Sequence, residues 1–198
     1  MNRRGTLFVV TGPSGAGKGT VLSQVFQKLD RLYFSVSATT RAPRQGEVDQ
    51  VHYFFISKDE FRDMIAQDRL LEYAEYVNNF YGTPEAPVEQ HLQNGDDVIL
   101  EIELQGALKV KAKRPDAVLV FIAPPSFEEL RRRLTGRGTE KPEVIEQRLT
   151  QARQECANME KYDYIVINDV LEGAVDELRS IIMAQRCVTA KRADLFAE

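Results

Sequence analysis

The sequence predicts an α/β fold, a three-layer core in which helices cover both faces of a parallel sheet. Strand-like and helix-like segments alternate along most of the chain, which indicates parallel strands joined by right-handed crossovers. Residues 118–123 are wholly apolar and residues 98–102 nearly so, the pattern of strands buried on both faces. A glycine-rich segment between the first strand and the first helix is the third indication. A chain of 198 residues is long enough for one domain with a sizeable core.

Each expected core element has a local signal. The strands are expected at residues 6–10, 32–36, 98–102, 118–123 and 164–167, and the first helix at residues 21–29. Ser126 and Glu129 have the form of a capping box that begins a second helix. Pro142 lies near the start of a long helix whose apolar positions extend to Met159. The last helix places an apolar face at residues 175, 178, 181 and 182.

Two segments interrupt this alternation. Residues 37–95 are rich in aromatic side chains and predict an inserted α+β lobe, in which a capping box at Ser57 and Glu60 begins one helix and another helix starts near Pro84. Residues 135–141 join two helices and carry glycines and cations, which is typical of a lid that closes over a phosphate. We therefore expect a single domain over residues 1–198, divided into a core (1–36, 96–134 and 149–198), a lobe (37–95) and a lid (135–148). A lobe and a lid around a phosphate-binding core indicate a kinase, so we call residues 37–95 the acceptor lobe, the part expected to bind the molecule that receives the phosphoryl group.

The segment after the first strand is a phosphate-binding loop, typical of a P-loop NTPase-type core. Its glycines allow a tight turn, so that backbone N–H groups and the helix N-terminus face a polyphosphate. Lys18 adds a charge that reaches the terminal phosphates. The residues expected to bind ATP, the donor of the phosphoryl group, are Gly12, Pro13, Ser14, Gly15, Ala16, Gly17, Lys18, Gly19 and Thr20.

The residue after the lysine departs from the usual motif. The strict pattern requires Ser or Thr there, but this chain has Gly19, with Thr20 one position later. We therefore expect Mg²⁺ to be held by phosphates and water without a direct protein ligand, and Thr20 to contact a phosphate. Glu101, at the end of a core strand, could orient metal-bound water. Its alternative role is a charge at the rim of the sheet.

Composition excludes several other classes of protein. The net charge of −4 argues against general nucleic-acid binding, because no broad excess of cations is present. No apolar run approaches membrane-spanning length, and the N-terminal run is too short for a signal peptide. Cys156 and Cys187 lack metal-binding spacing. We expect a cytoplasmic protein with no nucleic-acid or membrane partner, and its oligomeric state stays open.

Nine segments, in order along nearly the whole chain, resemble the guanylate kinases. They are residues 37–47, 52–54, 71–73, 79–83, 100–106, Arg133, residues 136–138, Arg148 and residues 163–169. The resemblance implies ATP-dependent phosphorylation of GMP to GDP, with dGMP as a further acceptor and Mg²⁺ entering with ATP.

The resemblance implies that the lobe grips the acceptor phosphate. Arg41 and Arg44 lie on one loop, and guanidinium groups suit phosphate oxygens. Tyr53 and Tyr81 can donate hydroxyl hydrogen bonds to the same phosphate. The alternative for the two arginines is a solvated basic loop.

Base selection requires a carboxylate, because guanine presents two adjacent N–H donors. By resemblance Glu72 reads them, with Ser37 and Thr83 as hydroxyl partners. Adenine would leave Glu72 unpaired in a closed pocket, which gives strong discrimination. Glu103 stands where the family most often has aspartate and also contacts the guanine. Its extra methylene requires an adjusted geometry.

Phosphoryl transfer needs charge stabilisation more than proton transfer, since the attacking phosphate is already ionised. By resemblance this catalytic part falls to Lys18, Arg41, Arg133, Arg137 and Arg148. Asn168, after the last strand, is expected to contact adenine or to order the loop.

Two other functions stay open from the residues. One is a non-catalytic module that binds protein partners, which the intact Lys18, Arg41 and Arg44 oppose. The other is a related kinase with a different acceptor. Glu72 opposes that alternative, whereas Glu103 is consistent with it.

Overall fold

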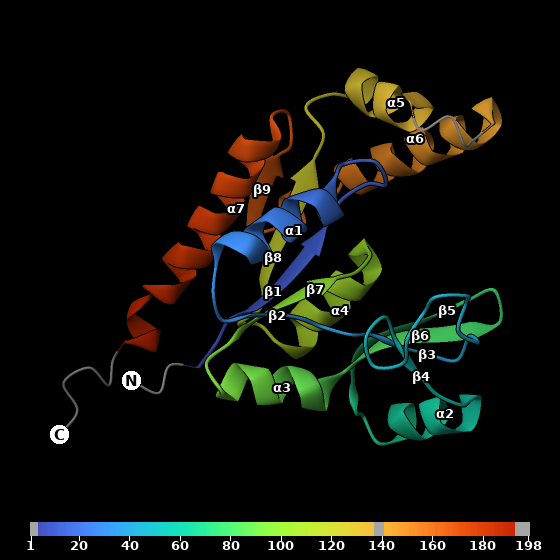
Figure 1. The fold of residues 1–198 in the computed structure, drawn as a ribbon, viewed down its shortest axis with the longest axis vertical. Coiled ribbons are helices and arrows are strands. Elements are labelled where there is room, and N and C mark those ends of the chain that lie inside the picture. Colours follow the sequence, from blue (N-terminus) through green and yellow to red (C-terminus); the bar gives the residue numbers. More distant parts are fainter. Residues whose placement is uncertain (1–3, 137–140, 193–198) are drawn as a thin grey trace.

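The structure, a computed structural model, describes residues 4–136 and 141–192 (Figure 1). Its centre is a parallel sheet with the strand order β2-β7-β1-β8-β9. The strands are β1 (Leu7–Thr11), β2 (Leu32–Phe34), β7 (Asp97–Glu101), β8 (Val118–Ala123) and β9 (Tyr164–Ile167). The first strand is central and pairs in parallel with both β7 and β8. The predicted α/β fold with a parallel sheet is confirmed, and the predicted strands differ from these only at their ends.

Helices cover both faces of this sheet, which gives the predicted three layers (Figure 1). On one face α1 (Lys18–Lys28) and α7 (Leu171–Arg186) pack on the sheet, in a cluster that includes Val21 and Leu178. On the other face α3 (Glu85–Gln93) and α4 (Leu104–Lys113) pack in a cluster that includes Val88.

The helix α4 is absent from the elements that the sequence predicted. Its signals are weak, because no side chain caps its N-terminus at Glu103 and Gly106 lies in its first turn. Only Ala107 and Val110 are fully buried, so the apolar stripe is narrow. A single buried stripe of two small side chains does not stand out from a loop.

A second, four-stranded sheet forms the outer part of the lobe, in the order β4-β3-β6-β5. Its strands are β3 (Ala38–Thr39), β4 (Phe54–Phe55), β5 (Leu70–Tyr76) and β6 (Asn79–Pro84). The helix α2 (Lys58–Ala66) packs on it through Phe61. The hydroxyl of Ser57 accepts a hydrogen bond from the backbone N–H of Glu60 at 3.1 Å, which confirms that predicted cap.

Adjacent residues of β5 belong to different cores. Leu70 lies in the small cluster around Phe61, whereas Leu71 lies in the main cluster with Val88 and Leu92 of α3. The prediction assigned residues up to 95 to the lobe, but the buried side chains of α3 pack against the central sheet. The start of β5 therefore joins the lobe to the core.

A pair of helices, α5 (Phe127–Gly136) and α6 (Pro142–Cys156), forms the opposite wall of the molecule (Figure 1). Ser126 caps α5 by accepting from the N–H of Glu129 at 3.1 Å, as predicted. Helix α5 continues through Gly136, into the segment predicted as a connection. Helix α6 ends before Met159, which lies in the short 3₁₀ helix η1 (Met159–Lys161). A second 3₁₀ helix, η2 (Thr189–Lys191), follows α7.

None of the helices in the described part of the chain is long and apolar enough to cross a bilayer.

Candidate active site

The glycines of the phosphate loop are required by space as well as conformation. Gly12 and Gly17 have φ values of 144° and 89°, which side-chain-bearing residues rarely adopt. A Cβ atom at Gly12 would lie 2.1 Å from the carbonyl oxygen of Ile122, and one at Gly17 would lie 2.4 Å from Nδ2 of Asn168. Gly17 also begins α1 without a capping side chain, so the N-terminal N–H groups of that helix are available to an anion.

Lys18 is folded over this loop from the first turn of α1. Its Nζ donates to the carbonyl oxygen of Gly12 at 2.6 Å and is 3.4 Å from that of Pro13. Burial lowers the pKa of Lys18, and the nearby carboxylates of Glu101 and Glu155 act in the opposite direction. The ammonium group therefore lies in a poorly solvated place where an additional anion would be strongly attracted.

Asn168 supports the phosphate loop through a buried hydrogen bond. It is 6% exposed, and its Nδ2 donates to the carbonyl oxygen of Ala16 at 2.7 Å. Its backbone carbonyl oxygen accepts from Nη2 of Arg133 at 2.8 Å, while Nε of Arg133 donates to Glu129 at 2.7 Å. Of the two roles expected for Asn168, these contacts are those of a residue that orders the loop. Arg133, expected to act on the phosphates, here joins α5 to Asn168.

Arg148 is the arginine of α6 that contacts the loop directly. Its Nη1 donates to the hydroxyl of Ser14 at 2.7 Å, a contact between residues 134 positions apart. On α5, Arg131 and Arg132 pair with Glu146 and Glu129. Arg137 lies outside the described residues.

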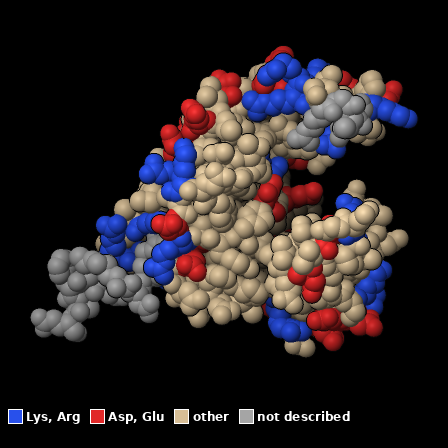
Figure 2. Space-filling model, viewed as in Figure 1, with Lys and Arg blue, Asp and Glu red and all other residues tan. Residues whose placement is uncertain are grey.

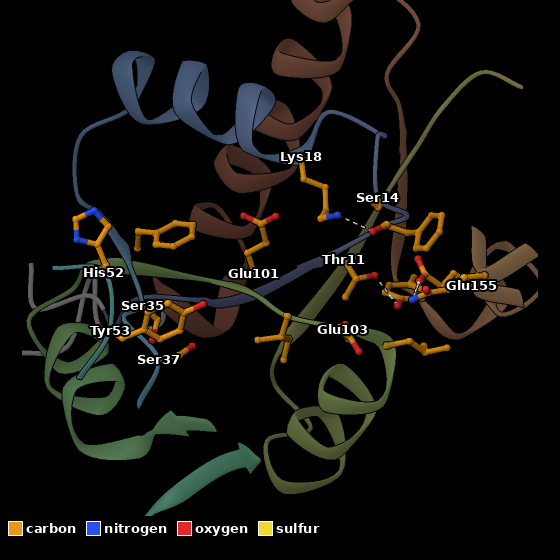
Figure 3. A pocket seen from close by; sticks show the side chains of 17 residues that line it. Thr11, Ser14, Lys18, Ser35, Ser37, His52, Tyr53, Glu101, Glu103 and Glu155 are labelled. Atoms are coloured by element: carbon orange, nitrogen blue, oxygen red, sulfur yellow. Dashed lines mark hydrogen bonds between the residues drawn. The ribbon is translucent and has the colours of Figure 1, made fainter. Parts of the chain in front are cut away.

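A hollow separates the α5–α6 pair from the smaller sheet, and acidic side chains lie within it (Figure 2). Two adjoining cavities of about 490 and 710 Å³ occupy this region. The first lies beside the loop and is lined by Gly12, Ser14 and Lys18 (Figure 3). The second is lined by Glu72 and Tyr81 of the lobe. Both are lined by Ser37, Tyr53, Glu101, Ile102, Glu103, Leu104, Gln151 and Glu155. The structure thus brings together residues predicted for the donor loop and the acceptor lobe.

In the lobe, Arg41 is already paired with a carboxylate. Its guanidinium donates to both oxygens of Glu47, at 2.7 and 2.9 Å, and lies 5.3 Å from the ring centroid of Tyr53. Glu47 also accepts from the backbone N–H of Arg44 at 2.7 Å. The Arg41 guanidinium, with this backbone N–H, lowers the pKa of Glu47 to about 2. Arg44 itself is exposed, as is Thr20 on α1.

Glu72 is the buried acid of the lobe. It is 9% exposed, and its Oε1 accepts a hydrogen bond from the Thr83 hydroxyl at 2.7 Å. Burial raises the pKa of Glu72, and the hydrogen bond from Thr83 opposes that effect. A carboxylate that is half satisfied and open to a cavity is suited to a ligand with N–H donors.

Glu101 and Glu103 line both cavities, one at the end of β7 and the other at the start of α4. Glu101 is the last residue of β7, and Glu103 is the N-cap of α4, with no capping hydrogen bond from its side chain. Figure 3 shows both carboxylates between the loop and the lobe. This is the carboxyl edge of a parallel sheet, where ligands of such folds bind.

Gln151 and Glu155 line both cavities, but the sequence reasoning missed them. Gln151 donates to Glu155 at 2.9 Å, and burial raises the pKa of Glu155. The signal was present, because Arg148, Gln151 and Glu155 are spaced by three and four residues and share one face of α6.

Comparisons with known proteins agree with this geometry. The sequence profile of the family described as Guanylate kinase matches residues 4–185. The chain is 51% identical to the guanylate kinase of Desulfitobacterium hafniense over 97% of this chain and 96% of that protein. It is 54% identical to a guanylate kinase of Thermus thermophilus over 92% of this chain and 83% of that protein. The crystal structure of guanylate kinase from Anaplasma phagocytophilum superimposes with a TM-score of 0.74 at 32% identity, over 96% of this chain and 90% of that one. With a profile that spans most of the sequence and relatives about half identical, the chain belongs to the guanylate kinase family.

Proposed function

We propose that this protein transfers the terminal phosphoryl group of ATP to GMP, giving ADP and GDP, and that it also accepts dGMP. The observation that carries the proposal is the pair of adjoining cavities. One is lined by residues of the phosphate loop and Lys18, and the other by Glu72, which is hydrogen-bonded to the buried Thr83. Family membership supports the same reaction.

Guanine recognition follows from the chemistry of Glu72. Its carboxylate accepts the N1–H and the 2-amino N–H of guanine, and Thr83 and Ser37 supply hydroxyls at the edge of the base. Glu103 lies across the cavity as a second carboxylate. Adenine has a bare N1 and no 2-amino group, so it would leave a buried carboxylate without a donor.

The acceptor phosphate is bound near Arg41. Tyr53 and Tyr81 lie edge to face with ring centroids 6.2 Å apart, and the Arg41 guanidinium lies 5.3 Å from the centroid of Tyr53, so both hydroxyls are proposed to contact the same phosphate. Arg44, on the same loop, supplies a second cation. Because Glu47 fixes the plane of the Arg41 guanidinium, the phosphate meets a group that is already oriented.

The transfer step depends on cations around the donor phosphates. Lys18 leaves the loop carbonyls and contacts the terminal phosphates, while Arg148 approaches from α6. Both neutralise charge on the transferred group. Arg137 is proposed to act with them, and Arg133 to position Asn168 beneath the loop.

Mg²⁺ enters this proposal with ATP. Within the described residues no group of three or more His, Cys, Asp and Glu side chains could enclose a metal ion. Mg²⁺ usually keeps several waters and is bound through one or two carboxylates and substrate phosphates. Glu101, beside Lys18 in the first cavity, is the carboxylate suited to hold its water shell. The ion would supply charge neutralisation at the phosphates.

We propose that the smaller sheet with α2 and the lid (135–148) close on the core when both substrates bind. The open hollow between the smaller sheet and the α5–α6 pair supports this proposal (Figure 2), and closure would exclude water that could otherwise hydrolyse ATP. Two free cysteines agree with the reducing cytoplasm that we propose as its location.

The test is ADP formation from MgATP with GMP, dGMP, AMP, UMP and ribose bisphosphate measured in parallel. We expect turnover with GMP and dGMP and at least about 10³-fold lower kcat/KM with AMP, the scale that polar-group recognition gives. Turnover on another acceptor would assign the pocket to a different substrate. No turnover on any acceptor would favour the binding module.

A further inference from the structure

Helix α4 carries two lysines that reach across to the lobe. We infer that Lys109 is a positioning residue for the acceptor, holding β5 in place and keeping Glu72 in the charged form that guanine requires. The inference deepens the proposed function and rests on it.

Two contacts place Lys109 against β5. Its Nζ donates to the carbonyl oxygen of Tyr73 at 2.7 Å and lies 5.2 Å from the ring centroid of that residue. One turn earlier on α4, a Cβ atom at Gly106 would lie 3.0 Å from Oε2 of Glu72. The same face of α4 therefore contacts both Glu72 and the residue after it.

A second lysine completes this attachment. Lys113, one turn after Lys109, donates to the carbonyl oxygen of Leu70 at 3.0 Å and to Asp68 at 2.9 Å. The two lysines thus bind the carbonyls on either side of Leu71 and Glu72. The register between β5 and β6 shifts between Leu70 and Glu72, so this is the irregular part of the strand that needs external support.

Lys109 is also the one cation among the described residues that line the second cavity. The acids that line it are Glu72, Glu75, Glu101, Glu103 and Glu155. Burial raises the pKa of Glu72, and Lys109 acts in the opposite direction, while Glu103 raises it further. Loss of Lys109 would leave Glu72 with the hydroxyl of Thr83 as a partner, but with only acids as charged neighbours among the described residues that line this cavity.

The consequence concerns pH. Glu72 must be ionised to accept two N–H donors, so any rise in its pKa removes active enzyme from the acidic side of the pH range. Lys109→Gln can still donate a hydrogen bond to Tyr73 but has no charge. Lys109→Arg keeps the charge.

The experiment measures kcat/KM for GMP and for ATP against pH in wild type, Lys109→Gln and Lys109→Arg. For Lys109→Gln we expect the acidic limb of the GMP profile to move up by about one pH unit, the scale of one nearby opposite charge. The ATP profile at saturating GMP should stay within twofold, and Lys109→Arg should restore the limb. GMP affinity measured by calorimetry without ATP should show the same shift.

Lys58→Gln is the matched control, because it removes one charge from the exposed start of α2 and does not line the cavity. It should leave both profiles unchanged. A Lys109→Gln profile that is lowered equally at every pH, or not changed, would overturn the inference while the proposed function stands. A wild type without activity on GMP would instead overturn the proposed function, and this inference with it.

Discussion

The donor loop and the acceptor lobe hold their charged groups by different means. The loop is fixed by backbone geometry and by a buried amide, with Gly12 against Ile122 and Asn168 on the carbonyl of Ala16. The lobe is fixed by side-chain pairs, Arg41 with Glu47 and Glu72 with Thr83. Backbone groups and the Asn168 amide do not change charge with pH, whereas the carboxylates of Glu47 and Glu72 do.

The surroundings differ in the same sense. The loop adjoins the main core, and its supporting residue Asn168 is buried. The lobe has a small cluster around Phe61, and its ion pair is partly exposed, at 15% for Arg41 and 19% for Glu47. We conclude that the proposed donor site is set by folding of the core, while the proposed acceptor site depends on individual side chains and on pH.

The largest expected effect comes from Lys18→Met. Loss of the ammonium group should lower kcat by about 10³-fold, the scale of one preorganised charge-stabilising donor. GMP affinity should be unchanged, since the hydrogen bonds of Lys18 go to its own loop. Assays of ADP formation measure kcat, and calorimetry measures the affinity for GMP. An equal loss of GMP affinity would mean that the two regions are not independent.

Asn168→Ala tests the buried support of the loop. The carbonyl of Ala16 would lose its partner, which should lower the free energy of unfolding by about 1–3 kcal/mol and raise the KM for ATP but not for GMP. Urea unfolding and steady-state kinetics provide both readouts. Asn168→Asp keeps the shape without the donor and should behave similarly. Retained stability in both variants would contradict the importance of this contact.

The hairpin between β5 and β6 offers a smaller effect without a change in activity. Val77 and Asn78 turn with φ values of 47° and 60°, and Val77 is 70% exposed. A β-branched residue is strained there, so Val77→Asn should raise the free energy of unfolding by about 1 kcal/mol. Val51→Asn is the control, because Val51 is similarly exposed without a positive φ. An equal gain in the control would show that exposure, not strain, is responsible.

The smallest effect is a difference in pH dependence. The pKa of Glu47 is lowered from 4.5 to about 2 in the folded protein, so the stability from its pair with Arg41 is present above pH 4.5. It is lost as the pH falls toward about 2. Between those values, the melting temperature of wild type should fall more steeply than that of Glu47→Gln. If the melting temperatures of the two proteins fall equally with pH, the pair does not stabilise the lobe.

The sequence predicted the loop well and the contacts between distant segments poorly. Residues 12–20 lie in one stretch, so their spacing and glycines are visible locally. The strands around them are apolar runs that need no partner to be identified. By contrast, the contact of Asn168 with Ala16 spans 152 positions, and the roles of Arg133 and Lys109 depend on which helix faces which strand. Helix α4 was not predicted, because Gly106 lies in its first turn and only two of its residues are buried, which gives little helical periodicity in the apolar positions.

The most direct test of the contrast between the two regions is calorimetry of GMP and of ATP binding to wild type and Glu72→Gln. The variant keeps the hydrogen-bonding shape of the side chain but places one donor where guanine also has donors. We predict that GMP affinity falls by about 10²-fold or more while ATP affinity stays within twofold. Equal GMP affinity in the two proteins, or a parallel loss for both nucleotides, would contradict the assignment of Glu72 as the group that reads the acceptor base.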